Sequence, residues 1–150
     1  MISLKVIRNG QELSQSVVKK LNHLMEKSFP GSHCPQELCN SNDYCFYLSK
    51  GSIVYSYVTV RLKDLLGYQY AELWNFCTHP DYRSNGYGTM LFNRTCSYLK
   101  RNYENPDFYQ LWVLKKNKRA QQFYKRMGFE ITGENKELSA FEMTNFQGLV

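Results

Sequence analysis

Hydrophobic positions along the chain follow two periods, one typical of strands and the other typical of helices. Short apolar runs that are rich in β-branched and aromatic residues, and bounded by Gly, Pro, Asn or Ser, predict strands. Such runs lie at residues 4–7, 44–48, 53–62, 68–78, 108–114, 129–132 and 138–144. The run at 108–114 is continuously apolar, which indicates a buried strand within a mixed sheet.

Apolar or small residues at helical spacing predict three helices. The first lies near residues 13–25, the second begins at the glycines around Gly88, and the third covers residues 120–127 and ends at Gly128, a natural C-cap. Residues 29–43 hold Pro, Gly, Ser, Asn and two Cys, so they predict a loop or a short irregular helix. With turns at 65–67 and 133–135, the predicted order is β-α-β-β-β-α-β-α-β-β.

Residues 71–89 are the stretch with the clearest chemical character. Pro80 donates no amide to a sheet and drives the residue before it towards extended geometry, so the strand should end near Thr78. Arg83 opens the spacing R-x-x-G-x-G, with Gly86 and Gly88 two residues apart. A helix start carries unpaired amides and partial positive charge, and glycines leave the approach open. The stretch therefore predicts a cradle for a pyrophosphate.

Other readings of these glycines are an ordinary strand-turn-helix, in which they serve only tight packing, and two nucleotide motifs. A dinucleotide fold needs a third glycine and an acidic residue about 20 positions further on. Positions 91 and 106 are Leu91 and Pro106. A nucleotide P-loop needs Gly-Lys-Ser/Thr, whereas Thr and Met follow Gly88. Neither nucleotide motif fits, and the packing interpretation stays open.

A second motif follows the first at residues 117–129. It has the form Asn-x-x-Ala-x-x-Phe-Tyr-x-x-x-Gly-Phe and consists of Asn117, Ala120, Phe123, Tyr124, Gly128 and Phe129. The first motif has the form apolar-x-Pro-x-x-(Arg/Gln)-x-x-Gly-x-(Gly/Ala), represented by Thr78, Pro80, Arg83, Gly86 and Gly88. Together, in this order and at this separation, they resemble the GNAT superfamily of N-acetyltransferases. The clear resemblance covers about residues 70–131.

The resemblance implies a fold and a cofactor. The fold is α/β, with a mixed, mostly antiparallel central sheet of about seven strands flanked by helices, in one domain over residues 1–150. The co-substrate is acetyl-CoA, with its pyrophosphate on the helix start, its pantetheine arm along the strand edge and Asn117 bonded to that arm. The expected cofactor-binding residues are Phe76, Cys77, Thr78, Arg83, Ser84, Asn85, Gly86, Tyr87, Gly88, Thr89, Asn117 and Tyr124.

The resemblance also implies two residues for proton transfer. Glu72 lies eleven residues before Arg83, where histone-type members carry a catalytic glutamate, and would be the base. Tyr124 lies where many members place a tyrosine beside the cofactor sulfur, and would be the acid. The plainer interpretations are a surface glutamate at a strand start and a core aromatic, and a water relay is another route for the base. Strand alternation would put Glu72, Trp74 and Phe76 on one face. Members that acetylate protein N-termini carry a glutamate where this chain has Trp112.

Length and composition agree with a single folded domain. The chain has 150 residues, of which 43% are hydrophobic, and no apolar run approaches the roughly 20 residues of a membrane span. The N-terminus lacks the apolar core of a signal peptide, so we expect a cytosolic or nuclear protein without a membrane anchor. The five cysteines form no C-x-x-C pair and no clear ligand set, which favours free thiols and no metal.

The net charge of +6 is concentrated in one segment. Residues 83–126 hold ten Lys or Arg against Glu104 and Asp107, so the rest of the chain is slightly acidic. Solvated helical surfaces account for some of these residues. Their concentration around the predicted phosphate cradle favours an anionic ligand, either coenzyme A or nucleic acid.

The sequence therefore predicts an acetyl-CoA-dependent N-acetyltransferase that transfers directly to a primary amine of a small-molecule or protein acceptor. The alternative is a non-catalytic module of the same fold that binds nucleic acid or a protein partner through its basic face. The absence of interleaved basic and aromatic motifs argues against nucleic acid. A longer acyl donor and a homodimer stay open, and the loops at 29–43 and 62–70 carry no signature of the acceptor.

Overall fold

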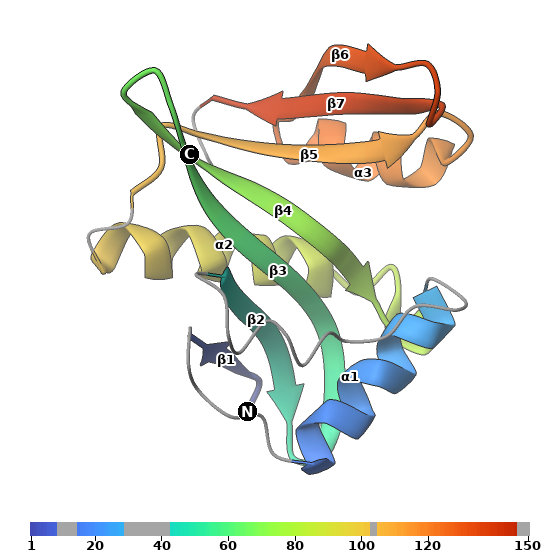
Figure 1. The fold of residues 1–150 in the computed structure, drawn as a ribbon. Coiled ribbons are helices and arrows are strands. Elements are labelled where there is room, and N and C mark those ends of the chain that lie inside the picture. The colour runs from blue at the N-terminus through green and yellow to red at the C-terminus, as the bar shows by residue number, and fades with distance from the viewer. Residues whose placement is uncertain (9–14, 29–42, 103–104, 147–150) are drawn as a thin grey trace. The chain divides into compact units, whose positions relative to one another are not determined.

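The computed structural model describes residues 1–8, 15–28, 43–102 and 105–146 (Figure 1). The strands are β1 (Ser3–Ile7), β2 (Asp43–Lys50), β3 (Ile53–Leu65), β4 (Tyr68–Thr78), β5 (Phe108–Leu114), β6 (Glu130–Asn135) and β7 (Ala140–Asn145). The helices are α1 (Gln15–Ser28), α2 (Tyr87–Arg101) and α3 (Lys118–Arg126), and a short 3-10 helix covers Pro80–Tyr82. The predicted order of strands and helices is confirmed.

The described strands form one sheet in the order β1-β2-β3-β4-β5-β7-β6. The pairs β1–β2, β2–β3, β5–β7 and β6–β7 run antiparallel. Strands β4 and β5 run parallel, with residues 70–72 opposite residues 108–110. Parallel neighbours need a crossover connection, which α2 supplies between β4 and β5. The mixed, mostly antiparallel sheet predicted above is therefore confirmed.

The chain divides into two compact units, each with its own buried residues. The first unit contains residues 1–61 and 75–95. Its core joins α1, β2, β3 and the end of β4 through side chains less than a tenth exposed, namely Leu21, Leu24, Cys45, Tyr47, Val54, Tyr57 and Cys77. The ring of Phe76, next to Cys77 on β4, lies 6.4 Å from the ring of Phe92 on α2. Neighbouring residues at the end of β4 thus pack against different helices.

The second unit contains residues 62–74 and 96–150. Every second residue of β5 is buried, at Tyr109, Leu111 and Val113. The residues between them are more open, and Trp112 is 44% exposed. The prediction that this strand is wholly buried was wrong. An apolar run does not reveal how many faces of a strand are covered, because tryptophan and leucine are also tolerated at half-exposed positions.

The C-terminal turn lies further along the chain than predicted. Residues 133–135 belong to β6, and the turn occupies residues 136–139, so β7 begins at Ala140. The register of β6 against β7 shifts between Ile131 and Gly133, which makes the glycine part of a strand irregularity. The Asn135 side chain accepts a hydrogen bond from the Leu138 amide at 3.1 Å and so shapes the turn after the strand. The predicted turn at residues 133–135 was therefore wrong, because these residues belong to β6.

Two of the sequence predictions fall largely outside the described residues. The predicted start of the first helix at Leu13 lies in residues 9–14, and the predicted loop at 29–43 is described only at Asp43.

Asp43 begins β2, where its carboxylate accepts bidentate hydrogen bonds from Arg61 on β3 at 3.0 Å. This ion pair holds the start of β2 against β3 within the first unit.

Candidate functional site

The turn between β4 and α2 is shaped by its own side chains. His79 Nδ1 accepts a hydrogen bond from the Asp81 amide at 3.1 Å, which caps the 3-10 helix. Arg83 Nε donates to the Thr78 carbonyl at 3.3 Å and ties the turn back to the strand. Asn85 Nδ2 donates to the carbonyls of Tyr82 and Arg83 at 3.1 and 3.0 Å. The bonds from Arg83 and Asn85 use carbonyl groups of the turn and none of the amides of residues 84–89.

The amides of Ser84 through Thr89 have no hydrogen-bond acceptor among the described residues. Ser84 and Gly86 both have positive φ, 66° and 81°. The first helical hydrogen bond of α2 joins the Met90 amide to the Gly86 carbonyl at 2.9 Å, so the preceding amides are helix-terminal donors. A run of unpaired amides at a helix start is a site for an anion.

Gly86 is required by backbone conformation and not by packing. A Cβ atom added there would have no described heavy atom within 4 Å, so there is space for a side chain. A φ of 81° is one that residues with side chains rarely adopt. The interpretation that this glycine serves only tight packing is therefore wrong.

An aromatic cluster lies beside the turn. The Tyr87 ring stacks on the Tyr55 ring with centroids 4.4 Å apart, and the Tyr82 ring meets Tyr55 edge-on at 4.9 Å. The His79 amide donates to the Tyr55 carbonyl at 2.9 Å. Burial raises the pKa of the Tyr55 phenol, and its neighbours Tyr87 and Tyr82 raise it further. Tyr55 therefore stays neutral, and its ring packs against the rings of Tyr82 and Tyr87 in the turn.

The end of β4, where the cofactor arm was predicted, is buried on one side by its own unit. Ser56 Oγ donates to the Cys77 carbonyl at 2.9 Å, and its hydroxyl lies 3.1 Å from the Thr78 hydroxyl. Cys77 is buried in the core formed with α1 and forms no disulfide with another described cysteine. It therefore occupies a structural position.

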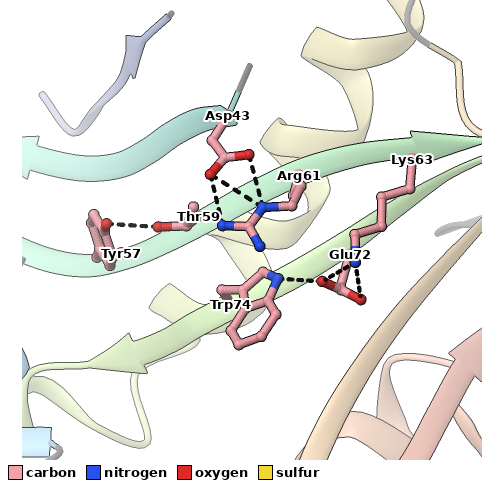
Figure 2. A network of polar contacts seen from close by, with 7 residues as sticks. All are labelled: Asp43, Tyr57, Thr59, Arg61, Lys63, Glu72 and Trp74. Atoms are coloured by element: carbon pink, nitrogen blue, oxygen red, sulfur yellow. Dashed lines mark hydrogen bonds and ion pairs between the residues drawn. The ribbon is translucent and has the colours of Figure 1, made fainter. Parts of the chain in front are cut away.

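Glu72, the predicted base, is buried and fully engaged within the second unit (Figure 2). Its Oε1 accepts a hydrogen bond from Trp74 Nε1 at 2.5 Å and lies 3.1 Å from Lys63 Nζ. Its Oε2 accepts from the same Lys63 Nζ at 3.2 Å. The interpretation as a surface glutamate is therefore wrong, because the residue is 5% exposed.

The alternation predicted along β4 holds only in part. Glu72 and Trp74 share a face, since their side chains are hydrogen-bonded to one another. Asn75, the next residue, has a φ of 55°, which is not strand geometry and interrupts the regular alternation. Because the alternation is interrupted at Asn75, it does not determine whether Phe76 lies on the same face as Glu72 and Trp74.

Tyr124 and Asn117, the predicted residues of the second motif, lie on α3. Tyr124 is 8% exposed, and its ring is 5.5 Å from Phe123 and 5.9 Å from Phe129. Asn117 is the N-cap of the helix, where its Oδ1 accepts from the Ala120 amide at 3.1 Å. The N-cap interpretation of Asn117 is confirmed. It leaves the Nδ2 group as a donor without an acceptor among the described residues.

Replacing Asn117 with alanine is expected to destabilise the protein. The Ala120 amide loses its acceptor, which costs about 1 kcal/mol. For a domain of this size that corresponds to a melting temperature lower by roughly 2–4 °C. Thermal unfolding followed by circular dichroism measures it, and an unchanged melting temperature would contradict the capping role.

Several basic residues of the 83–126 segment already have partners inside the protein. Lys115 forms an ion pair with Glu134 and lies over the Phe141 ring. Arg94 donates to the Ile2 carbonyl at 3.0 Å. On α3 the remaining basic side chains, Lys118, Arg119, Lys125 and Arg126, are exposed. Part of the positive charge is therefore an ordinary solvated helix surface.

Sequence reasoning missed Lys63 and Tyr55. The turn at residues 65–67 places Lys63 and Glu72 on neighbouring strands, so an opposite-charge pair across that turn was a readable signal. Tyr55 gave no comparable signal, because its partners lie about 30 residues away in the chain.

Among the described residues no group of His, Cys, Asp or Glu side chains has the arrangement of a metal site. In the same part of the chain, no helix has the length and apolar character needed to cross a membrane.

Comparison with known proteins gives a consistent result. The model of the acetyltransferase (GNAT) family matches residues 18–129. An uncharacterized N-acetyltransferase of Methanocaldococcus jannaschii is 42% identical over 60 residues, which are 40% of this chain and 26% of that protein. The chain thus matches only about a quarter of the length of this curated relative.

Solved structures show the same fold at low sequence identity. An acyl-CoA N-acyltransferase from Pseudomonas aeruginosa superposes with a TM-score of 0.73 at 15% identity, covering 97% of this chain and 99% of that one. Naa50 of Arabidopsis thaliana, in complex with the bisubstrate analogue CoA-Ac-MVNAL, superposes with a TM-score of 0.70 at 18% identity, covering 96% and 97%.

Proposed function

Because the chain belongs to the GNAT family of acetyltransferases, we propose that it is an acetyl-CoA-dependent N-acetyltransferase acting directly on a primary amine. The observation that carries this proposal is the run of unpartnered amides from Ser84 to Thr89 at the start of α2. These donors would bind the pyrophosphate of the coenzyme, with Arg83 beside them. Naa50, a protein of the same fold, is in complex with the bisubstrate analogue CoA-Ac-MVNAL, and the CoA part of that analogue supports this choice of ligand.

The remaining cofactor contacts follow the same proposal. Phe76, Cys77 and Thr78 would line the pantetheine arm at the strand edge, where main-chain groups can pair with its amides. Asn117 would donate its Nδ2 hydrogens to that arm while Oδ1 stays on the Ala120 amide. Acetyl-CoA supplies an activated acetyl group, and coenzyme A leaves as a thiol.

Side chains of the protein would then carry out two proton transfers. An alkylamine with a pKa of about 10.4 is protonated at neutral pH, and removing its proton costs roughly 4–5 kcal/mol. Glu72 would accept this proton, directly or through water, since its carboxylate is held in place by Lys63 and Trp74. Tyr124 would supply a proton to the departing thiolate.

The first test is calorimetry with acetyl-CoA. Binding is expected at micromolar to sub-millimolar concentration, and S-acetyl pantetheine, which lacks the pyrophosphate, should bind far more weakly. No heat of binding for acetyl-CoA in this range would defeat the proposal.

The Asn117→Asp variant tests the proposed hydrogen bond from Asn117 Nδ2 to the pantetheine arm without disturbing the helix cap. Aspartate keeps the acceptor for the Ala120 amide but loses the Nδ2 donor. We expect an unchanged melting temperature with weaker acetyl-CoA binding, measured by calorimetry beside Asn117→Ala. Equal affinity for Asn117→Asp and the parent protein would remove Asn117 from the cofactor site.

The acceptor is best identified by a screen. Polyamines, aminoglycosides, lysine peptides and N-terminal peptides are incubated with acetyl-CoA, and the free thiol released is measured. The comparisons give no support to a non-catalytic module that binds through a basic face. The single domain over residues 1–150, the cytosolic or nuclear location and a homodimer stay predictions from the sequence.

A further inference from the structure

The Glu72 carboxylate is already paired with Lys63 and Trp74 within the protein (Figure 2). Lys63 Nζ lies 3.1 Å from Oε1 and 3.2 Å from Oε2, so one ammonium bridges both oxygens. The Trp74 indole donates to Oε1 at 2.5 Å. Among the described residues, Oε1 is therefore held by two donors and Oε2 by Lys63.

Among the described residues, Lys63 is the cation that contacts the carboxylate, and Arg61, two residues earlier on β3, is paired with Asp43. Lys63 approaches from β3, and on β4 the neighbours two residues away, Tyr70 and Trp74, are uncharged. On β5 the residue in register with Glu72 is Gln110, which is neutral as well. Within the described residues the negative charge of Glu72 is thus balanced by Lys63.

The two partners of this ion pair differ in exposure. The Glu72 side chain is 7% exposed, whereas the Lys63 side chain is 39% exposed. The cation stabilises the buried carboxylate, because an unpaired buried charge is strongly destabilising. A second ammonium beside Lys63 would be repelled by it. A cationic acceptor can therefore reach Oε2 only by taking the place of Lys63, whose long side chain can move into water.

We propose that Lys63 is an exchangeable substitute for the acceptor ammonium, and that Trp74 holds the carboxylate in position while the two cations exchange. This inference rests on the proposed function, since it gives Glu72 the role of the base. When Lys63 leaves, the N–H bond of the acceptor ammonium breaks and an O–H bond forms at Oε2, which gives a neutral amine and a neutral carboxyl. After the reaction Glu72 releases the proton to water and Lys63 returns.

The chain contains two tryptophans, so in a Trp112→Phe background the fluorescence reports on Trp74 alone. Because the Trp74 indole donates a hydrogen bond to Glu72, a cation that displaces Lys63 from this carboxylate should change the emission of Trp74.

The exchange itself is tested with n-butylammonium as the probe, again through Trp74 emission and at constant ionic strength. Without Lys63 as a competitor, the probe should act at a concentration lower by about fivefold. Lys115→Met is the matched control, because it removes another lysine–glutamate ion pair of the same unit, with Glu134. If Lys63→Met responds at the parent concentration, or at a higher one, the two cations do not exchange.

Kinetics with an amine from the acceptor screen provide the second measurement. Lys63→Met should lower the KM for the amine by about fivefold, and Lys115→Met should leave it unchanged. A raised KM in Lys63→Met would mean that Lys63 binds the acceptor and would overturn the proposal. If no amine is acetylated the proposed function fails, and the fluorescence measurements still decide whether Lys63 and an ammonium compete for Glu72.

Discussion

The Gly86→Val variant is expected to bind acetyl-CoA at least about tenfold more weakly than the parent protein. Gly86 has a φ of 81°, and a left-handed residue with a side chain costs about 1–2 kcal/mol, more when it is β-branched. The turn would relieve this strain by changing the orientation of the amides of residues 84–89. The new methyl groups would also occupy space that is open in the described structure. Calorimetry gives the dissociation constant directly.

Gly51→Val is the matched control for this experiment. Gly51 lies in the turn between β2 and β3, has a φ of 57° and also has open space around an added Cβ. Its replacement should cause comparable backbone strain and a lower melting temperature, with unchanged acetyl-CoA affinity. If both variants bind acetyl-CoA like the parent protein, the pyrophosphate does not lie on this turn.

Glu72→Gln and Tyr124→Phe are each expected to lower kcat by about 10²–10³-fold while acetyl-CoA affinity stays nearly unchanged. Glutamine keeps the size of the side chain but cannot accept the proton of the ammonium. Phenylalanine keeps the ring but cannot protonate a thiolate. Steady-state kinetics with an amine from the screen measure kcat, and calorimetry measures the affinity.

Buried residues of the same kinds provide controls for both variants. Asp43 is a second buried carboxylate with a cationic partner, Arg61, and Asp43→Asn should lower stability without lowering kcat. Tyr109 is a second buried tyrosine, and burial raises the pKa of its phenol, with a further contribution from Cys96. Tyr109→Phe should likewise leave kcat unchanged. Unchanged turnover in both Glu72→Gln and Tyr124→Phe would mean that the reaction uses other residues.

Local signals gave most of the fold. The bounds of β4 and β5 agree with the predicted strands, because proline at position 80 and the Asn-Pro pair at 105–106 interrupt pairing whatever surrounds them. The start of α2 after Gly86 was predicted from two glycines at the right spacing. The same residue type misled at Gly133, where a strand irregularity and a turn have the same local signature.

The candidate site was only partly readable. Gly86 was identified because its own backbone conformation favours glycine, and Asn117 because it accepts a hydrogen bond from an amide three residues along the chain. The ion pair between Lys63 and Glu72 and the stacking of Tyr87 on Tyr55 depend on segments brought together by the sheet. Spacing along the chain contains little information on such contacts.

The sequence by itself determined the order of elements, the turn at residues 79–86 and the family, because periodicity, proline and glycine act over a few residues. Only the tertiary structure decided that Glu72 is buried and already paired with a cation, and that one face of β5 is open. The physical reason is that burial and ion pairing depend on which strands become neighbours, and a residue's neighbours along the chain do not determine that.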